Sequence, residues 1–369
     1  MNRAHGLDGL RGAAALAVVL VHAWMYSGKN DIGRNETLHD VISEGRVALM
    51  SFFVMSGFLV ILPWVRAAID GRPMPSTRRY LGKRAARILP AYWVALVGAY
   101  VLLQGTNHRR EAELGDLPYF ALFGQNYFDH TRALLNPPTW SLAVEVSFYA
   151  LIPVFGWIII QAVRRGGRKA ALAVAAVLMA GGIAFNYAAA VGEWPRTTTT
   201  TLPAFLPVFA CGIAAAALTY GRTLGRPWRV VLLTAGTALV IWNGWWHHDG
   251  TALLGDVLLD FPAGIGFAFI VVALVERAPK VLTAGPLRWI GIVSYGFYLW
   301  HMPVLYGLRL YDQWPEEPWR AYLYVVVLSL ALATLSWFGV ERWVASEGRA
   351  KSTSRTRRRL DPQPSRSTA

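Results

Sequence analysis

Long runs of apolar residues recur along the chain from residue 7 almost to its C-terminal end, with polar residues gathered between them. A helix needs about 20 predominantly apolar residues to cross the hydrocarbon core of a bilayer. The pattern predicts about ten membrane-spanning helices, at residues 7–26, 46–66, 86–104, 140–161, 170–190, 202–220, 229–246, 258–276, 287–309 and 321–343. The apolar stretch 117–125 is too short to cross and is expected to be re-entrant or interfacial.

Composition supports a membrane protein rather than a soluble one. Apolar residues make up 54% of the 369 residues, charged residues only 16%, and the mean hydropathy is +0.35. A soluble domain carries more charge and interrupts its apolar runs sooner. We therefore expect an all-α integral membrane protein with one transmembrane domain at residues 1–344 and a basic, disordered cytoplasmic tail at 345–369.

The basic residues predict how the chain is oriented. Cytoplasmic loops carry an excess of Lys and Arg. With the N-terminus inside, about three quarters of the 36 Lys and Arg residues fall in segments that would be cytoplasmic. Both termini are therefore expected in the cytoplasm. The net charge of +14 is explained by this topology and by contact with membrane lipid, so no nucleic-acid partner is expected.

The first apolar run is expected to stay in the membrane as a span. Arg11 interrupts its apolar core, and no small-x-small cleavage site precedes Trp24 and Tyr26. Arg11 and His22 are eleven residues apart, nearly three whole helical turns, so they share one face about 16 Å apart along the axis. The shared face favours a common cavity. The alternatives are a snorkelling anchor for Arg11 and an interfacial histidine for His22.

Glu145 lies in the fourth predicted span, five residues after Trp140 and on the same face as Ser141. Counting residues places it at the depth of His22. A carboxylate beside an imidazole would orient the ring and stabilise its protonated form, which predicts His22 and Glu145 as catalytic residues. The alternative is a structural glutamate paired with a neighbouring helix.

The ninth predicted span contains Tyr295, Tyr298 and His301, which we assign to the substrate pocket with Trp140 and Ser141. An interfacial aromatic belt explains the same residues without a function. At the start of the third span, Arg84 and Arg87 form an i, i+3 pair that can clamp a phosphate by forked hydrogen bonds.

Metal ligands are not predicted. Cys211 is the only cysteine and lies in an apolar stretch, and His247 and His248 are adjacent, external and without convergent ligands. We expect no metal site.

Five motifs in order resemble acyltransferase family 3, the multi-span O-acyltransferases of membranes. They are Leu7-Asp-Gly-Leu-Arg-Gly followed by His22, Ser51-Phe-Phe-Val-Met-Ser-Gly-Phe-Leu, Arg84-Ala-Ala-Arg87, Trp140-Ser-Leu-Ala-Val-Glu-Val-Ser-Phe-Tyr, and the stretch from Tyr295 to His301. The resemblance implies transfer of a short acyl group, commonly acetyl, from acyl-CoA to a hydroxyl of a carbohydrate. It also implies that His22 is central to catalysis and that Arg84 and Arg87 lie near acyl-CoA. Some members carry an external soluble domain that this sequence does not show.

The predicted function is therefore a bacterial cytoplasmic-membrane enzyme with acyl-CoA (acetyl-CoA) as donor, no metal, and a carbohydrate or glycoconjugate of the cell envelope as acceptor. The phosphates would dock at Arg84 and Arg87, with Arg11 assisting, while His22 activates the acceptor hydroxyl. An acyl-histidine intermediate is a rival scheme. Three other functions stay open: acylation of a small glycosylated metabolite at the cytoplasmic face, a proton-coupled transporter or flippase with a relay of His22, Glu145 and His301, and a non-catalytic scaffold.

Overall fold

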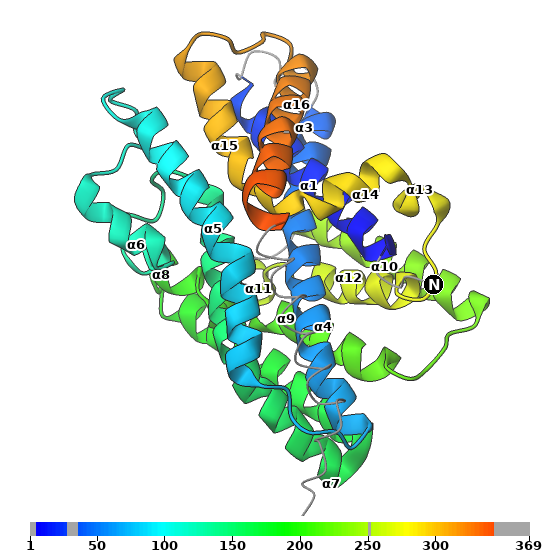
Figure 1. Cartoon of the computed structure of the whole chain (residues 1–369). Coiled ribbons are helices and arrows are strands. Elements are labelled where there is room, and N and C mark those ends of the chain that lie inside the picture. The colour runs from blue at the N-terminus through cyan, green and yellow to red at the C-terminus, as the bar shows by residue number, and fades with distance from the viewer. Residues whose placement is uncertain (1–4, 28–35, 250–251, 343–369) are drawn as a thin grey trace, which may run out of the picture.

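The computed structural model describes residues 5–27, 36–249 and 252–342, and the regular elements of this part are all helices (Figure 1). The expectation of an all-α protein is confirmed. The predicted tail at 345–369 lies outside the described residues, as do the side chains of His247 and His248.

Six helical stretches of the described residues are long and apolar enough to cross a membrane. They contain the helices α1 (His5–Tyr26), α4 (Ala48–Ile69), α5 (Thr77–Leu103), α7 (Trp140–Val191), α9 (Leu202–Thr219) and α16 (Pro318–Ser336). The chain is thus a multi-span membrane protein. Each predicted span falls on a helix, but the count of ten and the location of the termini stay predictions.

Two of the predicted spans, 140–161 and 170–190, belong to the 52-residue helix α7. Its helical dihedral angles break at Gly166 and Gly167, where Gly167 has φ 61° and ψ −153°. Only glycine adopts that region without strain. The break divides α7 into two helical segments that coincide with the two predicted spans.

The predicted spans at 229–246, 258–276 and 287–309 correspond to shorter or divided helices. They are α10 (Arg226–Asp249), α12 (Phe261–Leu274) and the pair α14 (Gly285–Ile292) and α15 (Ser294–Leu310), which is divided at Val293. Short elements complete the described fold: α3 (Glu36–Ser43), η1 (Glu44–Val47), η2 (Leu114–Asp116), α6 (Leu117–Ala121), η3 (Gln125–Tyr127), η4 (Pro137–Thr139), α8 (Arg196–Thr199), α11 (Ala252–Leu258), α13 (Lys280–Thr283) and the π-helical η5 (Trp337–Glu341).

Helix α1 packs with its backbone directly against α13 and α14. A Cβ atom on Gly291 would lie 1.7 Å from the backbone oxygen of Asp8, and one on Gly9 would lie 1.8 Å from that of Leu282. Small residues permit such close helix contacts in membrane proteins. This packing fixes the first turns of α1, which carry Arg11.

The helices α4, α7 and α9 share an aromatic core. Phe53, Phe148 and Phe209 stack in series, with ring centroids 4.7 Å apart for Phe53 and Phe209 and 4.1 Å for Phe148 and Phe209. All three are fully buried, so each contributes a large apolar area to the packing. The stack holds the first segment of α7 against α4, and this arrangement places the residues of α7 that face the functional site.

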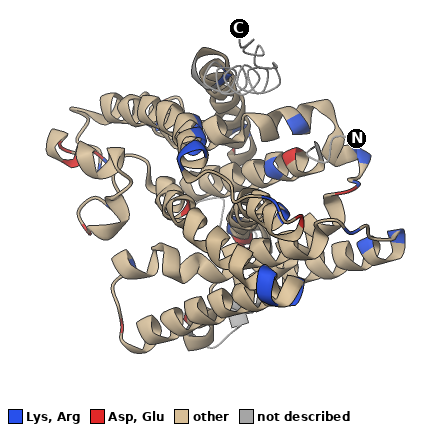
Figure 2. Cartoon of the chain, turned by 60° about the horizontal axis from the view of Figure 1, so that its bottom comes forward, with Lys and Arg blue, Asp and Glu red and all other residues tan. Residues whose placement is uncertain are grey.

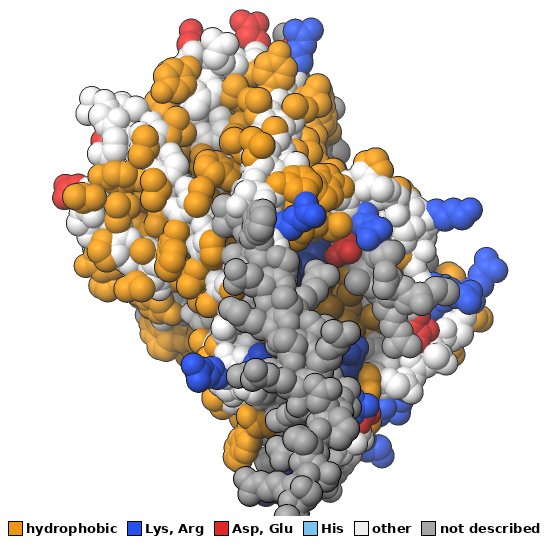
Figure 3. All heavy atoms as spheres, viewed as in Figure 1, with side chains coloured by type: hydrophobic (Ala, Val, Ile, Leu, Met, Phe, Trp, Pro, Cys, Tyr) orange, Lys and Arg blue, Asp and Glu red, His pale blue; other side chains and the backbone are white. Residues whose placement is uncertain are grey.

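The outer surface of α5 is apolar, as expected for contact with lipid. Trp93, Val97 and Val101 lie at i, i+4 and i+8 and are 45%, 57% and 66% exposed. On the face drawn in Figure 3, hydrophobic side chains cover much of the region of α5, α15 and α16. Figure 2, which brings the bottom of the bundle forward, shows Lys and Arg on several helix ends and connections.

Candidate functional site

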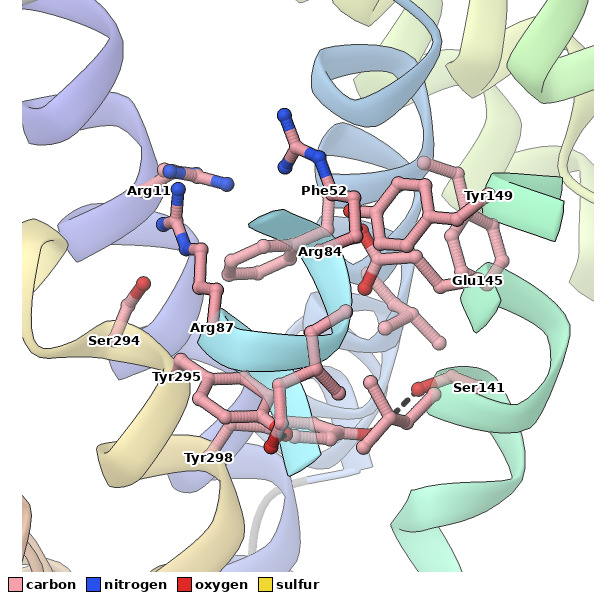
Figure 4. A pocket seen from close by; sticks show the side chains of 14 residues that line it. Arg11, Phe52, Arg84, Arg87, Ser141, Glu145, Tyr149, Ser294, Tyr295 and Tyr298 are labelled. Atoms are coloured by element: carbon pink, nitrogen blue, oxygen red, sulfur yellow. Dashed lines mark hydrogen bonds between the residues drawn. The ribbon is translucent and has the colours of Figure 1, made fainter. Parts of the chain in front are cut away.

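A cavity lies where α1, α4, α5, α7 and α15 meet (Figure 4). It holds about 720 Å³ of empty space, including the part open to solvent. Its 14 lining residues are Arg11, Leu49, Phe52, Phe53, Arg84, Arg87, Ile88, Ser141, Leu142, Glu145, Tyr149, Ser294, Tyr295 and Tyr298.

Three arginines from two helices share one side of this cavity. Figure 4 shows Arg11 of α1 beside Arg84 and Arg87 of α5. The guanidinium carbon of Arg84 lies 5.3 Å from the ring centroid of Tyr149. Among the described residues, no carboxylate oxygen lies within 4.0 Å of a nitrogen of these three arginines. The structure therefore brings together the three residues predicted to bind the donor, in an arrangement suited to an anion.

Glu145 lies in the cavity wall of α7 and accepts hydrogen bonds from the hydroxyls of Ser56 and Tyr149. These two hydroxyls are themselves 3.0 Å apart, and the hydroxyl of Tyr80 donates to the backbone oxygen of Tyr149 at 3.1 Å. The sequence reasoning missed Ser56, Tyr80 and Tyr149. Tyr149 was recognisable, because it follows Glu145 by four residues and therefore shares its helix face.

The partner of His22 is His301, not Glu145. His22 Nδ1 lies 3.3 Å from His301 Nε2, and the ring centroids are 5.0 Å apart. His301 is fully buried. The described hydrogen bonds of Glu145 join it to hydroxyls on the arginine side of the cavity and not to His22, so its catalytic role stays a prediction.

Tyr298 connects the cavity with the histidine pair. Its ring lines the cavity and lies 5.4 Å from the ring of His301, while His22 and His301 are not among the lining residues. The Tyr298 hydroxyl donates to the backbone oxygen of Pro138 at 2.5 Å and lies 2.8 Å from Ser141 Oγ, the contact dashed in Figure 4. Tyr298 and Ser141 thus form a bridge between α15 and the start of α7.

The remaining predicted pocket residues differ in position. Tyr295 lines the cavity and donates from its hydroxyl to the backbone oxygen of Ile88 at 2.8 Å, which ties α15 to α5 beside Arg87. Trp140 does not line the cavity. Its ring packs on Phe205, with centroids 5.1 Å apart, and is partly buried against the hydrophobic core, so its assignment to the substrate pocket stays a prediction.

No group of three or more His, Cys, Asp or Glu side chains suited to a metal ion occurs among the residues that the structure describes. The single cysteine, Cys211, is a buried free thiol. The polar side chains at the cavity and the histidine pair are three arginines, several hydroxyls, one carboxylate and two imidazoles.

The fold and the cavity define a multi-span membrane protein with a cationic internal site. Residues 4–338 match the family described as Acyltransferase domain, and the chain belongs to this family. The resemblance found in the sequence motifs is thereby confirmed.

Among its relatives is Nodulation protein 10 of Rhizobium leguminosarum bv. viciae, 26% identical over 92% of both chains. Peptidoglycan O-acetyltransferase OatA of Listeria monocytogenes is 24% identical over 93% of this chain and 56% of its own length. O-acetyltransferase OatA of Staphylococcus aureus is 22% identical over 93% and 57%. The chain thus spans just over half the length of these two O-acetyltransferases. No solved structure matches it significantly.

Proposed function

We propose that this membrane acyltransferase moves a short acyl group, acetyl in the first instance, from acyl-CoA to a hydroxyl of a carbohydrate of the bacterial cell envelope. The observation that carries the proposal is the group of three arginines in the cavity, which have no carboxylate of the described residues at ion-pair distance. Such a group suits a ligand with several phosphates, and coenzyme A carries three.

On the donor side, Arg84 and Arg87 hold the phosphates and Arg11 adds a third cation from α1. Guanidinium groups bind phosphate oxygens by paired, charge-assisted hydrogen bonds. The acyl-pantetheine arm then extends along the cavity towards Tyr298 and Ser141, which lie at the end of the cavity next to the histidine pair.

On the acceptor side, His22 removes the proton from the acceptor hydroxyl while that oxygen attacks the thioester carbonyl. A hydroxyl is a poor nucleophile until a base within hydrogen-bond reach takes its proton. Glu145 holds Ser56 and Tyr149 in the cavity wall near Arg84. The acyl-histidine scheme uses the same His22 and stays an alternative route to the same product.

The relatives support a glycan acceptor, because two of them are named O-acetyltransferases and one of those is named for peptidoglycan. We propose the cytoplasmic membrane as the location, with ten spans and both termini inside. The alternative function, a transporter with a proton relay through His22, Glu145 and His301, receives less support. The described contacts join His22 to His301 but not to Glu145.

The proposal is tested by binding of labelled acetyl-CoA to the purified protein in lipid. Each charge-assisted hydrogen bond contributes about 1.5–3 kcal/mol, so Arg84→Ala/Arg87→Ala should weaken binding at least about 100-fold. The matched control is Arg164→Ala/Arg165→Ala, which removes two exposed arginines from α7 outside the cavity and should bind as wild type does. Equal binding by all three proteins would refute the donor site.

A further inference from the structure

The contacts of His301 determine which of its ring nitrogens carries a proton. His301 Nδ1 lies 2.5 Å from the backbone oxygen of Tyr298. A carbonyl oxygen can only accept, so Nδ1 must be the N–H donor of this bond. In the neutral ring Nε2 therefore has a free lone pair, and this atom faces His22 at 3.3 Å.

The same reasoning fixes the tautomer of His22. Its Nδ1 lies 2.9 Å from the backbone oxygen of Val18 and 3.3 Å from His301 Nε2, and both partners are acceptors. His22 Nδ1 must then carry the proton that they share. The remaining nitrogen, Nε2, is left with the lone pair that a general base needs.

We infer that His301 is a positioning residue for His22, which holds the base in its Nδ1–H tautomer and accepts a hydrogen bond from the imidazolium as it forms. A carboxylate fills this place in hydrolase triads, and here a neutral histidine fills it. The inference rests on the proposed function, since it assumes that His22 is the base of the transfer reaction.

The geometry allows His22 to gain a proton without any rearrangement of the pair. When His22 Nε2 takes the proton, Nδ1 continues to donate to Val18 O and to His301 Nε2, so all three contacts persist. If His301 were protonated instead, its Nε2–H would face the Nδ1–H of His22. Two donors facing each other are unfavourable, so the pair directs the proton to His22.

With His22 Nε2 as the base, every bond and proton of the acyl transfer is accounted for. The acceptor oxygen forms a bond to the thioester carbonyl carbon while its proton passes to His22 Nε2. The carbon–sulfur bond then breaks, and the proton on Nε2 passes to the leaving sulfur. The products are the ester and the CoA thiol, and both histidines return to their starting tautomers.

Two amide substitutions of His301 distinguish a residue that positions His22 from one that only supports the fold. The amide of glutamine reaches the place of Nε2, whereas the amide of asparagine reaches the place of Nδ1. His301→Gln therefore keeps an acceptor towards His22, and His301→Asn keeps only the contact with Tyr298 O. Both variants bury an amide of similar polarity in the same fully buried site.

The measurement is CoA release by purified protein in lipid nanodiscs, with acetyl-CoA as donor and N-acetylglucosamine oligomers as acceptor. A thiol reagent reports the release with little background, because Cys211 is the only cysteine and is buried. We expect His301→Asn to lose about 100-fold in kcat with the KM for acetyl-CoA unchanged, and His301→Gln to recover most of that loss.

Binding of labelled acetyl-CoA and the thermal unfolding midpoint are measured on the same samples. If wild type neither binds acetyl-CoA nor releases CoA, the proposed function itself fails. If wild type is active, His22→Ala is inactive and His301→Asn keeps the wild-type kcat, only the inference about His301 fails. Equal loss in the Asn and Gln variants at wild-type stability would also overturn it, because an acceptor at Nε2 would then not suffice.

Discussion

The arginine cavity predicts a substitution that stabilises the protein while it removes ligand binding. Arg87 shares the cavity with two like charges, Arg11 and Arg84, and with the opposite charge of Glu145. It makes no described hydrogen bond or ion pair. Replacing Arg87 by Met keeps most of the apolar stem and removes the charge, so the free protein should become more stable.

The size of the effect follows from Coulomb's law. For a separation taken as about 7 Å and an effective dielectric constant near 20, Coulomb's law gives about 2 kcal/mol for each charge pair. One attraction to Glu145 offsets one of the two repulsions, which leaves about 2 kcal/mol. The Arg87 side chain is exposed to the cavity, and solvent screening reduces this to about 1 kcal/mol. Most substitutions destabilise by about that amount, so the sign is diagnostic.

Thermal unfolding in detergent, followed by tryptophan fluorescence with and without CoA, measures both consequences. We expect Arg87→Met to raise the midpoint by about 2 °C without ligand. CoA at about 100 times its Kd should stabilise the wild type by about 2.7 kcal/mol, and the variant by much less. Arg164→Met, an exposed arginine on α7, is the matched control and should change neither quantity.

The reasoning would be refuted if Arg87→Met lowered the midpoint by more than about 2 °C and kept the full CoA shift. That result would mean that Arg87 is paired in the free protein and contributes nothing to ligand binding.

Two further predictions concern the bridge and the packing that position the site. Tyr298→Phe and Ser141→Ala should each cost about 1 kcal/mol of stability. The two losses should not be additive in the double variant, because both hydroxyls belong to one network with Pro138 O. Additive losses in chemical denaturation would contradict this. Gly291→Ala should displace α1 and abolish activity, because its Cβ would lie 1.7 Å from a backbone oxygen, whereas Gly181→Ala, with nothing within 4 Å, should be tolerated. Limited proteolysis and CoA release check the glycine pair.

Much of the fold could be predicted from the sequence because membrane crossing requires long apolar runs. Even the break in α7 was foreseeable, since the apolar run is interrupted by basic residues and Gly166-Gly167. The convergence of Arg84 and Arg87 followed from their i, i+3 spacing. The common cavity expected for Arg11 and His22 did not follow from helical periodicity, because Arg11 lines the cavity and His22 does not.

Contacts between distant helices were not predictable, because hydropathy does not fix the rotation of one helix relative to another. Glu145 meets Ser56 across 89 positions and His22 meets His301 across 279. Glu145 was expected beside His22 only because the two residues have similar depths in the membrane. In the structure α7 packs on α4 so that Glu145 meets Ser56 on the arginine side of the cavity. The contacts of Trp140 were unpredictable for the same reason, since its aromatic partners lie on other helices.

The central claim is that the protein transfers an acyl group from acyl-CoA to a glycan hydroxyl with His22 as the general base. It is tested most directly by following label from acetyl-CoA into N-acetylglucosamine oligomers. The purified protein, reconstituted in lipid, is compared with His22→Ala. The account predicts saturable, time-dependent O-acetylation by wild type and its loss by at least about 100-fold in the variant, with acetyl-CoA binding retained. Undiminished O-acetylation by His22→Ala would contradict the account.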